Sequence, residues 1–128
     1  MADEPSARCV LVVEDEADAR EMMREIIEME GCTVIEAANG AEALRALTTS
    51  RPCLIVVDLL MPVMDGVQLL EELRSRPALA AIPVVIATSA PHRAPRGVPV
   101  LVKPIDLNTL WGWIRRTCQC AGAASGTA

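Results

Sequence analysis

The chain has 128 residues, of which 52% are hydrophobic, and this is enough for one domain with a single core. The formal net charge is -5 and the basic residues are scattered, which argues against direct nucleic-acid binding, because that function needs a basic face. The N-terminal stretch MADEPSARC lacks a secretory signal pattern, and the apolar runs are too short to span a membrane. We therefore expect a cytoplasmic protein with no membrane partner.

Short runs rich in valine and isoleucine alternate with segments of helical periodicity along the chain. The runs predicted to be strands cover residues 9–13, 33–37, 53–57, 83–87 and 98–102. Helices are predicted over residues 17–30, 41–47 and 67–74, and a last helix follows Asp106, a good N-cap. Fully apolar strands that alternate with helices predict a parallel sheet with helices on both faces.

The connection between the last two predicted strands is short. It consists of residues 88–97, TSAPHRAPRG, whereas a crossover that contains a helix needs at least ~10–12 residues with its loops. Pro95 also disfavours helical geometry at Ala94. We predict that the fourth crossover helix is absent or cut to about one turn. Val98, Val100 and Val102 would then need another cover, from the loop or from a second protein.

Chemically active side chains follow four of the five predicted strands. Glu14 and Asp15 follow the first strand, Asp58 the third, Thr88 the fourth and Lys103 the fifth. In parallel sheets these strand ends meet at one edge, where binding sites lie. Carboxylates ~5 Å apart repel by about 3 kcal/mol per pair at an effective dielectric of ~20. A cation must therefore lie among them.

The candidates for that cation are Lys103 and a divalent metal, and an all-oxygen cluster suits Mg²⁺ or Mn²⁺. Three carboxylates, one such metal ion and one ammonium have no net charge. This balance suits a site for a phosphoryl group. Metal and lysine would neutralise its oxygens, a hydroxyl would bond to one of them, and a carboxylate would be the nucleophile.

Four motifs occur in this order between residues 11 and 104: LVVEDE, VVDLLMPVMDG, ATS and VLVKP. In this combination the chain resembles, over residues 8 to about 117, the receiver domains of two-component response regulators, of the chemotaxis-regulator kind. The resemblance implies an α/β, flavodoxin-like, doubly wound sheet of five parallel strands in the order 2-1-3-4-5. Residues 1–118 would form the receiver domain, and residues 119–128 a flexible C-terminal tail.

The resemblance also implies roles for the residues at the strand ends. Asp58 resembles the phosphoacceptor, Thr88 the switch hydroxyl and Lys103 the phosphoryl-binding lysine. The resemblance also implies that the Lys103–Pro104 peptide bond is cis. Four positions would hold Mg²⁺, namely Glu14, Asp15, Asp58 and the backbone carbonyl of Leu60. One departure is Val100, where the family usually has a tyrosine or phenylalanine.

The function implied is a signalling domain that catalyses only its own phosphorylation and dephosphorylation. Its donor would be a sensor histidine kinase or a phosphotransfer protein, and the face of the fourth and fifth strands would contact a homodimer partner or a downstream protein. A degenerate receiver used as a binding module remains an alternative. A Mg²⁺-dependent aspartyl-phosphate phosphatase is less favoured, because Leu60 stands where such enzymes usually carry a second aspartate. An FMN-binding domain is disfavoured by EDEAD after the first strand, where a Ser/Thr/Gly-rich loop is needed.

Overall fold

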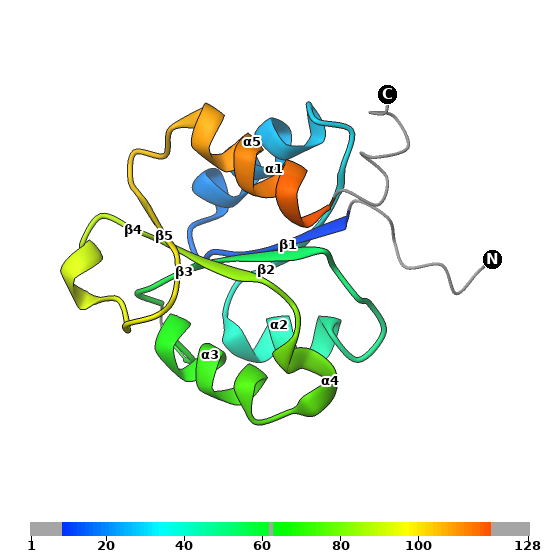
Figure 1. Cartoon of the computed structure of the whole chain (residues 1–128), viewed down its shortest axis with the longest axis vertical. Coiled ribbons are helices and arrows are strands. Elements are labelled where there is room, and N and C mark those ends of the chain that lie inside the picture. The colour runs from blue at the N-terminus through cyan, green and yellow to red at the C-terminus, as the bar shows by residue number, and fades with distance from the viewer. Residues whose placement is uncertain (1–8, 62, 119–128) are drawn as a thin grey trace.

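The computed structural model describes residues 9–61 and 63–118, and these form one sheet of five parallel strands in the predicted order β2-β1-β3-β4-β5 (Figure 1). The strands are β1 (Cys9–Val13), β2 (Thr33–Ala37), β3 (Leu54–Asp58), β4 (Val84–Thr88) and β5 (Val100–Val102). The helices are α1 (Ala17–Glu28), α2 (Gly40–Ala46), α3 (Gly66–Arg74), α4 (Pro77–Ala80), the single-turn 3-10 helix η1 (Pro91–Arg93) and α5 (Leu107–Thr117).

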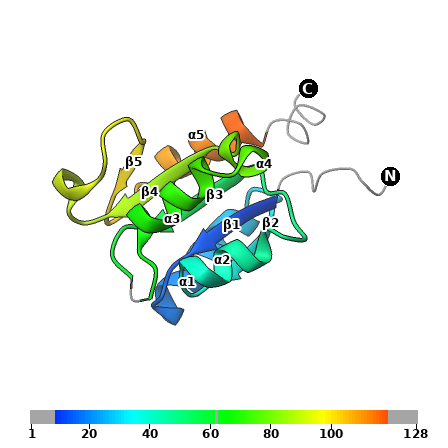
Figure 2. The ribbon, with the colours of Figure 1, turned by 90° about the horizontal axis from the view of Figure 1, so that it is seen from below.

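Helices cover both faces of the sheet, with α1 and α5 on one side and α2, α3 and α4 on the other (Figures 1 and 2). On the first side Ile27, Leu110 and Ile114 are fully buried against alternate strand residues. On the second side the other strand residues pack against Leu69 and Leu73 of α3 and their neighbours. The continuous valine and isoleucine runs of the strands follow from this arrangement, because both faces of each central strand are buried.

The strand boundaries lie within one or two residues of those predicted, and the differences have local causes. The predicted helix 17–30 ends at Glu28, and Gly31 follows with a φ of 86°, which suits glycine. The fifth strand was predicted over residues 98–102 but begins at Val100. Pro99, one residue earlier, has no N–H to donate, although its carbonyl accepts from the Ile86 N–H at 2.9 Å.

The predicted loss of the crossover helix is confirmed. The connection between β4 and β5 contains only η1, and the short helix α4 lies earlier in the chain, between α3 and β4. The connection itself covers part of the β4–β5 face that lacks a crossover helix, because Ala94 and Val98 pack against the core cluster beneath α3. Val102 remains 52% exposed, so the cover is incomplete.

The predicted tail, residues 119–128, lies outside the described residues. Among the helices of the described ranges, we find none that combines the length and the apolar character needed to span a membrane.

Candidate functional site

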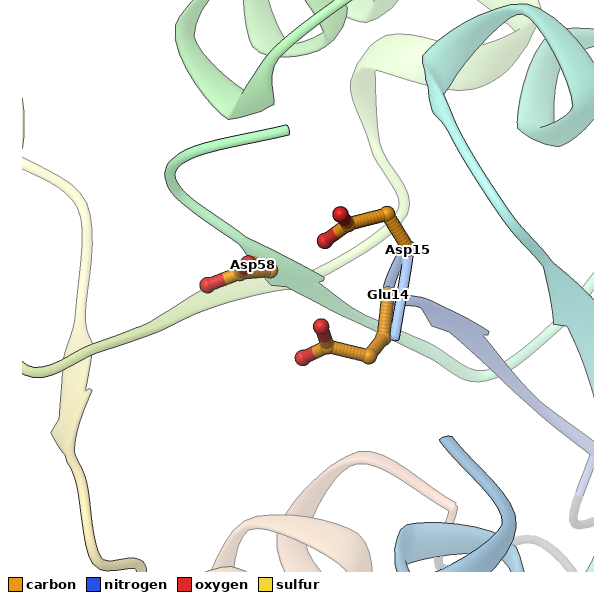
Figure 3. Close-up of side chains that lie close together, drawn as sticks. All are labelled: Glu14, Asp15 and Asp58. Carbon is orange, nitrogen blue, oxygen red and sulfur yellow. The ribbon is translucent and has the colours of Figure 1, made fainter. Parts of the chain in front are cut away.

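Three carboxylates meet at the carboxyl edge of the sheet. Glu14 and Asp15 follow the last residue of β1, and Asp58 is the last residue of β3. Because β1 and β3 are parallel neighbours, their ends coincide, and one carboxylate oxygen from each residue lies within 4.8 Å of the other two (Figure 3). Glu14 is buried, Asp58 is half-buried and Asp15 is exposed, so the cluster opens to solvent beside Asp15.

Lys103 brings a positive charge into this cluster from the far end of β5. Its Nζ lies 3.1 Å from Oε1 of Glu14 and 3.3 Å from Oδ1 of Asp58. The Lys103–Pro104 peptide bond is cis, as predicted. The lysine therefore joins two of the three acids, and Asp15 is the acid most open to a second cation.

Burial and charge act together on the acid that ends β3. Burial raises the pKa of Asp58, the Glu14 carboxylate raises it further, and the Lys103 ammonium only partly offsets both. For Lys103, burial alone would lower the pKa. The hydrogen bond to Glu14 and the charges of Asp58 and Glu14 outweigh that effect and raise the pKa of Lys103. The acids therefore hold the lysine protonated, but one ammonium does not neutralise three carboxylates.

The donor set of the cluster fits a hard divalent cation. All three candidate ligands are carboxylate oxygens, which is the chemistry that Mg²⁺ prefers, and Mg²⁺ usually keeps several waters beside one or two carboxylates. The exposed side of the cluster leaves room for such waters. The expected ligand role of the Leu60 carbonyl stays a prediction, and the Leu60 side chain itself is 53% exposed.

Thr88 lies at the same edge, as the last residue of β4. It is buried, and its Oγ1 accepts a hydrogen bond of 2.9 Å from the Ala90 N–H. In the β3–β4 ladder its chain neighbour Ala87 is paired with Asp58. The structure therefore brings the predicted hydroxyl to the strand end beside the predicted phosphoacceptor.

The loop after β3 is built to hold Asp58 in place. Asp65 caps α3: its Oδ1 accepts from the Gln68 N–H at 2.9 Å, and its own N–H donates to Gln68 Oε1 at 3.0 Å. The N–H of Gly66 donates to the Leu59 carbonyl at 2.9 Å. A Cβ on Gly66 would meet the Asp58 carbonyl oxygen at 2.8 Å, so only glycine fits here. Asp65 and Gly66 are therefore the residues at which the chain enters α3.

Sequence reasoning missed one polar network beside the acids. Arg20 donates from Nη1 to the backbone oxygen of Glu14 at 2.7 Å and from Nε to Oε1 of Glu36 at 3.0 Å. Arg24, one helical turn later, binds the other oxygen of Glu36 at 2.6 Å. The signal in the sequence was weak: two arginines spaced by four in the helix after the acid pair, and one acid within an otherwise uncharged strand.

Comparisons with known proteins identify the family to which the chain belongs. The model of the response regulator receiver domain family matches residues 10–114. An uncharacterized 14.6 kDa protein of Leptolyngbya boryana is 33% identical over 116 residues, which are 85% of this chain and 88% of that protein. The transcriptional regulatory protein PrrA of Mycobacterium tuberculosis is 33% identical over 121 residues, 91% of this chain but 52% of the relative. The chain thus spans about half the length of that regulator.

Solved structures show the same architecture. The receiver domain of a signal transduction histidine kinase from Syntrophus aciditrophicus superposes with a TM-score of 0.80 at 32% identity, covering 88% of this chain and 91% of that one. The chemotaxis protein CheY4 of Vibrio cholerae gives a TM-score of 0.75 at 28% identity, covering 85% and 97%. Since the family model covers most of the chain and the fold agrees, the chain belongs to the response regulator receiver domain family.

Proposed function

We propose that Asp58 accepts a phosphoryl group from the phosphohistidine of a partner, a sensor histidine kinase or a phosphotransfer protein, and that the transfer requires Mg²⁺. The observation that supports this most is the cluster of three carboxylates with Lys103 between two of them. Three carboxylates this close repel one another, and an ordinary solvent-exposed loop gains nothing that would offset this repulsion. A site for a dianionic group does need such an arrangement of metal ligands and ammonium.

In the transfer, an oxygen of the Asp58 carboxylate attacks the phosphorus. The bond from phosphorus to the donor's imidazole nitrogen breaks, and the imidazole keeps the electron pair. Bound Mg²⁺ would supply positive charge to the phosphoryl oxygens, with Glu14, Asp15, Asp58 and the Leu60 carbonyl as its protein ligands. The Lys103 ammonium, 3.3 Å from Asp58, is close enough to bond to an oxygen of the new phosphoryl group.

The response to phosphorylation would begin at Thr88. In the unphosphorylated chain its hydroxyl oxygen accepts from the Ala90 N–H. The phosphoryl group adds about -1.5 to -2 charge and strong acceptor oxygens, which favours rotation of the Thr88 side chain so that its hydroxyl moves toward them. That rotation would loosen the contact with Ala90 and shift the start of the β4–β5 connection, including η1. The aromatic residue that the family uses beside this connection is replaced by Val100, so the shift would act through the connection itself.

A groove beside the acids offers a docking site for the phosphodonor. It has a volume of about 510 Å³ and runs between α1 and the segment that enters α5. Glu14 and Lys103 lie in its lining, together with apolar side chains that include Met22, Met23 and Leu107. Met22 is 61% exposed, so an apolar surface is available directly next to the carboxylates that the donor must reach.

The incompletely covered β4–β5 face offers a separate surface for a downstream partner. Residues 84–102, which form β4, β5 and the connection between them, include two arginines, Arg93 and Arg96, and no acidic residue. Arg93 and Arg96 are exposed in the connection that leads to β5, and Val102 is exposed on the strand itself. A symmetric homodimer through this face would bring like charges together, so we infer an acidic partner with apolar contacts. Sedimentation at low salt should then show a monomer, with and without phosphorylation, whereas a dimer that dissociates in Val102→Glu would favour self-association.

Two alternatives are less well supported. A degenerate receiver that only binds partners has no use for the intact set of Glu14, Asp58 and Lys103. A phosphatase that uses an aspartyl-phosphate needs a proton donor near the nucleophile, and the residue two positions after Asp58 is the apolar Leu60.

The proposal can be tested with beryllium fluoride, which imitates a phosphoryl group on a carboxylate. Fluorine NMR of the protein with Mg²⁺ should show one bound fluoride species that disappears in Asp58→Asn and in excess EDTA. A bound species that persists in Asp58→Asn would contradict the assignment of Asp58.

A further inference from the structure

We propose that Arg20 is a positioning residue for the metal site, which it serves through the backbone of Glu14. This inference rests on the proposed Mg²⁺ site and adds a residue to it that touches neither the metal nor the phosphoryl group. The supporting contact is the 2.7 Å hydrogen bond from Arg20 Nη1 to the backbone oxygen of Glu14.

The peptide unit that carries this oxygen joins Glu14 to Asp15. A peptide unit is planar, so its orientation sets ψ of Glu14 and φ of Asp15 together. These two angles decide how the two carboxylates are aimed relative to each other. A group that holds this one carbonyl therefore controls the geometry of both candidate ligands at once.

The sheet holds only one side of Glu14. Its N–H donates to the Ala37 carbonyl at 3.0 Å, which continues the pairing of β1 with β2 by one residue. Beyond that point the chain turns away toward α1, and the Arg20 guanidinium binds the carbonyl of Glu14 in place of the next backbone donor. The Glu14 side chain is restrained separately, by Lys103 at Oε1 and by the Glu16 N–H at Oε2, 3.2 Å away.

The guanidinium is itself anchored at a second point. Its Nε binds Oε1 of Glu36 on the edge strand β2, and Arg24 holds the other oxygen of that carboxylate. The side chains of Arg20 and Glu36 are only 20% and 27% exposed, so the pair is better shielded than a surface ion pair. Two attachment points in a rigid planar group fix the direction of the N–H that reaches Glu14, which a single flexible ammonium would not do.

The sign of the effect distinguishes positioning from simple charge. Arg20 is a cation near an anionic site, so loss of its charge alone would strengthen Mg²⁺ binding. Loss of positioning would weaken it, because the two carboxylates would have to be ordered when the metal binds. Changes to groups that hold metal ligands in place typically cost 10–100-fold in affinity.

The experiment measures the Mg²⁺ dissociation constant by calorimetry for the full chain and for four variants. Arg20→Met should raise that constant about tenfold, the low end of the usual range. Arg20→Lys should give an intermediate value, and Glu36→Gln should also weaken binding, because it releases the anchor of Arg20. Arg24→Met is the matched control: it removes the same charge from the same helix and one contact to Glu36, but it leaves the bond to Glu14, so the constant should stay near that of the parent.

A second measurement separates positioning from loss of stability. In phosphorylation by a small phosphodonor, Arg20→Met should need more Mg²⁺ for half-maximal rate but reach the parental rate at saturating Mg²⁺. Equal Mg²⁺ affinity in Arg20→Met and Arg24→Met, or tighter binding in Arg20→Met, would overturn the role of Arg20 while leaving the proposed function intact. Failure of the parent chain itself to bind Mg²⁺ would overturn both.

Discussion

The backbone N–H of Lys103 donates a hydrogen bond of 2.9 Å to the backbone oxygen of Thr88. This bond continues the parallel pairing of β4 with β5 past Val102, which is opposite Thr88 in the register. It joins Thr88, the candidate switch residue at the end of β4, to Lys103, the candidate phosphoryl-binding lysine directly after β5. The short connection between these strands therefore keeps the site geometry, although it has no crossover helix of more than one turn.

The lifetime of the phosphorylated form should be long. Leu60 and Ala90 lie two residues after Asp58 and Thr88, near the expected path of an attacking water, and neither side chain can orient that water. Leu60→Asn and Ala90→Glu should lose phosphate faster by about tenfold, less than the ~10²–10⁴ that a full general base supplies. Release of inorganic phosphate from purified phosphoprotein measures the rate. Rates equal to that of the parent in both variants would rule out this explanation.

Asp58→Asn should stabilise the metal-free protein at neutral pH. The folded state raises the pKa of Asp58 through burial and through Glu14, so folding favours the protonated acid. Its favourable contribution is present below the unfolded value of 3.8 and is lost as pH rises through the higher folded pKa. The asparagine cannot ionise and should be more stable by about 1 kcal/mol at pH 7, with a smaller difference near pH 4.

Urea unfolding in EDTA at both pH values measures these differences. Added Mg²⁺ should reverse the order at pH 7, because the parent gains about 2.7 kcal/mol when Mg²⁺ is present at 100 times its dissociation constant. If the asparagine variant is the less stable one in EDTA at neutral pH, the ammonium of Lys103 outweighs the burial of Asp58 and its repulsion by Glu14.

Two glycine substitutions should have opposite effects. Gly66→Ala places a Cβ 2.8 Å from the Asp58 carbonyl oxygen and 3.0 Å from the Leu59 Cα, so the backbone at the phosphoacceptor must shift, at a cost of about 1–3 kcal/mol. Gly112→Ala lies within α5, where the nearest atom is the end of the Arg116 side chain at 3.7 Å. It should stabilise the protein by about 0.5–1 kcal/mol.

Thermal unfolding and the phosphorylation rate, measured on both variants, test this pair. Gly66→Ala should also slow phosphorylation, whereas Gly112→Ala should not change it. A Gly66→Ala variant with parental stability and rate would show that the loop after β3 is looser than its contacts imply.

The sequence was most informative where one local rule decides the structure. The apolar strand runs end at polar residues, and parallel strands place their ends at one edge, so the convergence of Glu14, Asp58 and Lys103 could be predicted without coordinates. The short β4–β5 connection was predictable for a similar reason, because its length and Pro95 leave little room for a helix.

Other features depend on tertiary contacts that a sequence pattern does not reveal. Helix α4 has four residues, which are too few to show helical periodicity in the sequence. Pro77 at its start is equally compatible with a turn. The Arg20–Glu36 pair joins a helix to an edge strand 16 residues away, and both residues look like ordinary solvated charges in the sequence. Val102 was expected to need a cover, but only the structure shows that the loop stops short of it.

The central claim is that Asp58 is the Mg²⁺-dependent phosphoacceptor, and intact mass after incubation with Mg²⁺ and acetyl phosphate tests it most directly. The parent should gain the mass of one phosphoryl group. Asp58→Ala should gain none, and neither should the parent in excess EDTA. A full gain of mass in Asp58→Ala, or in the parent without divalent metal, would contradict the account.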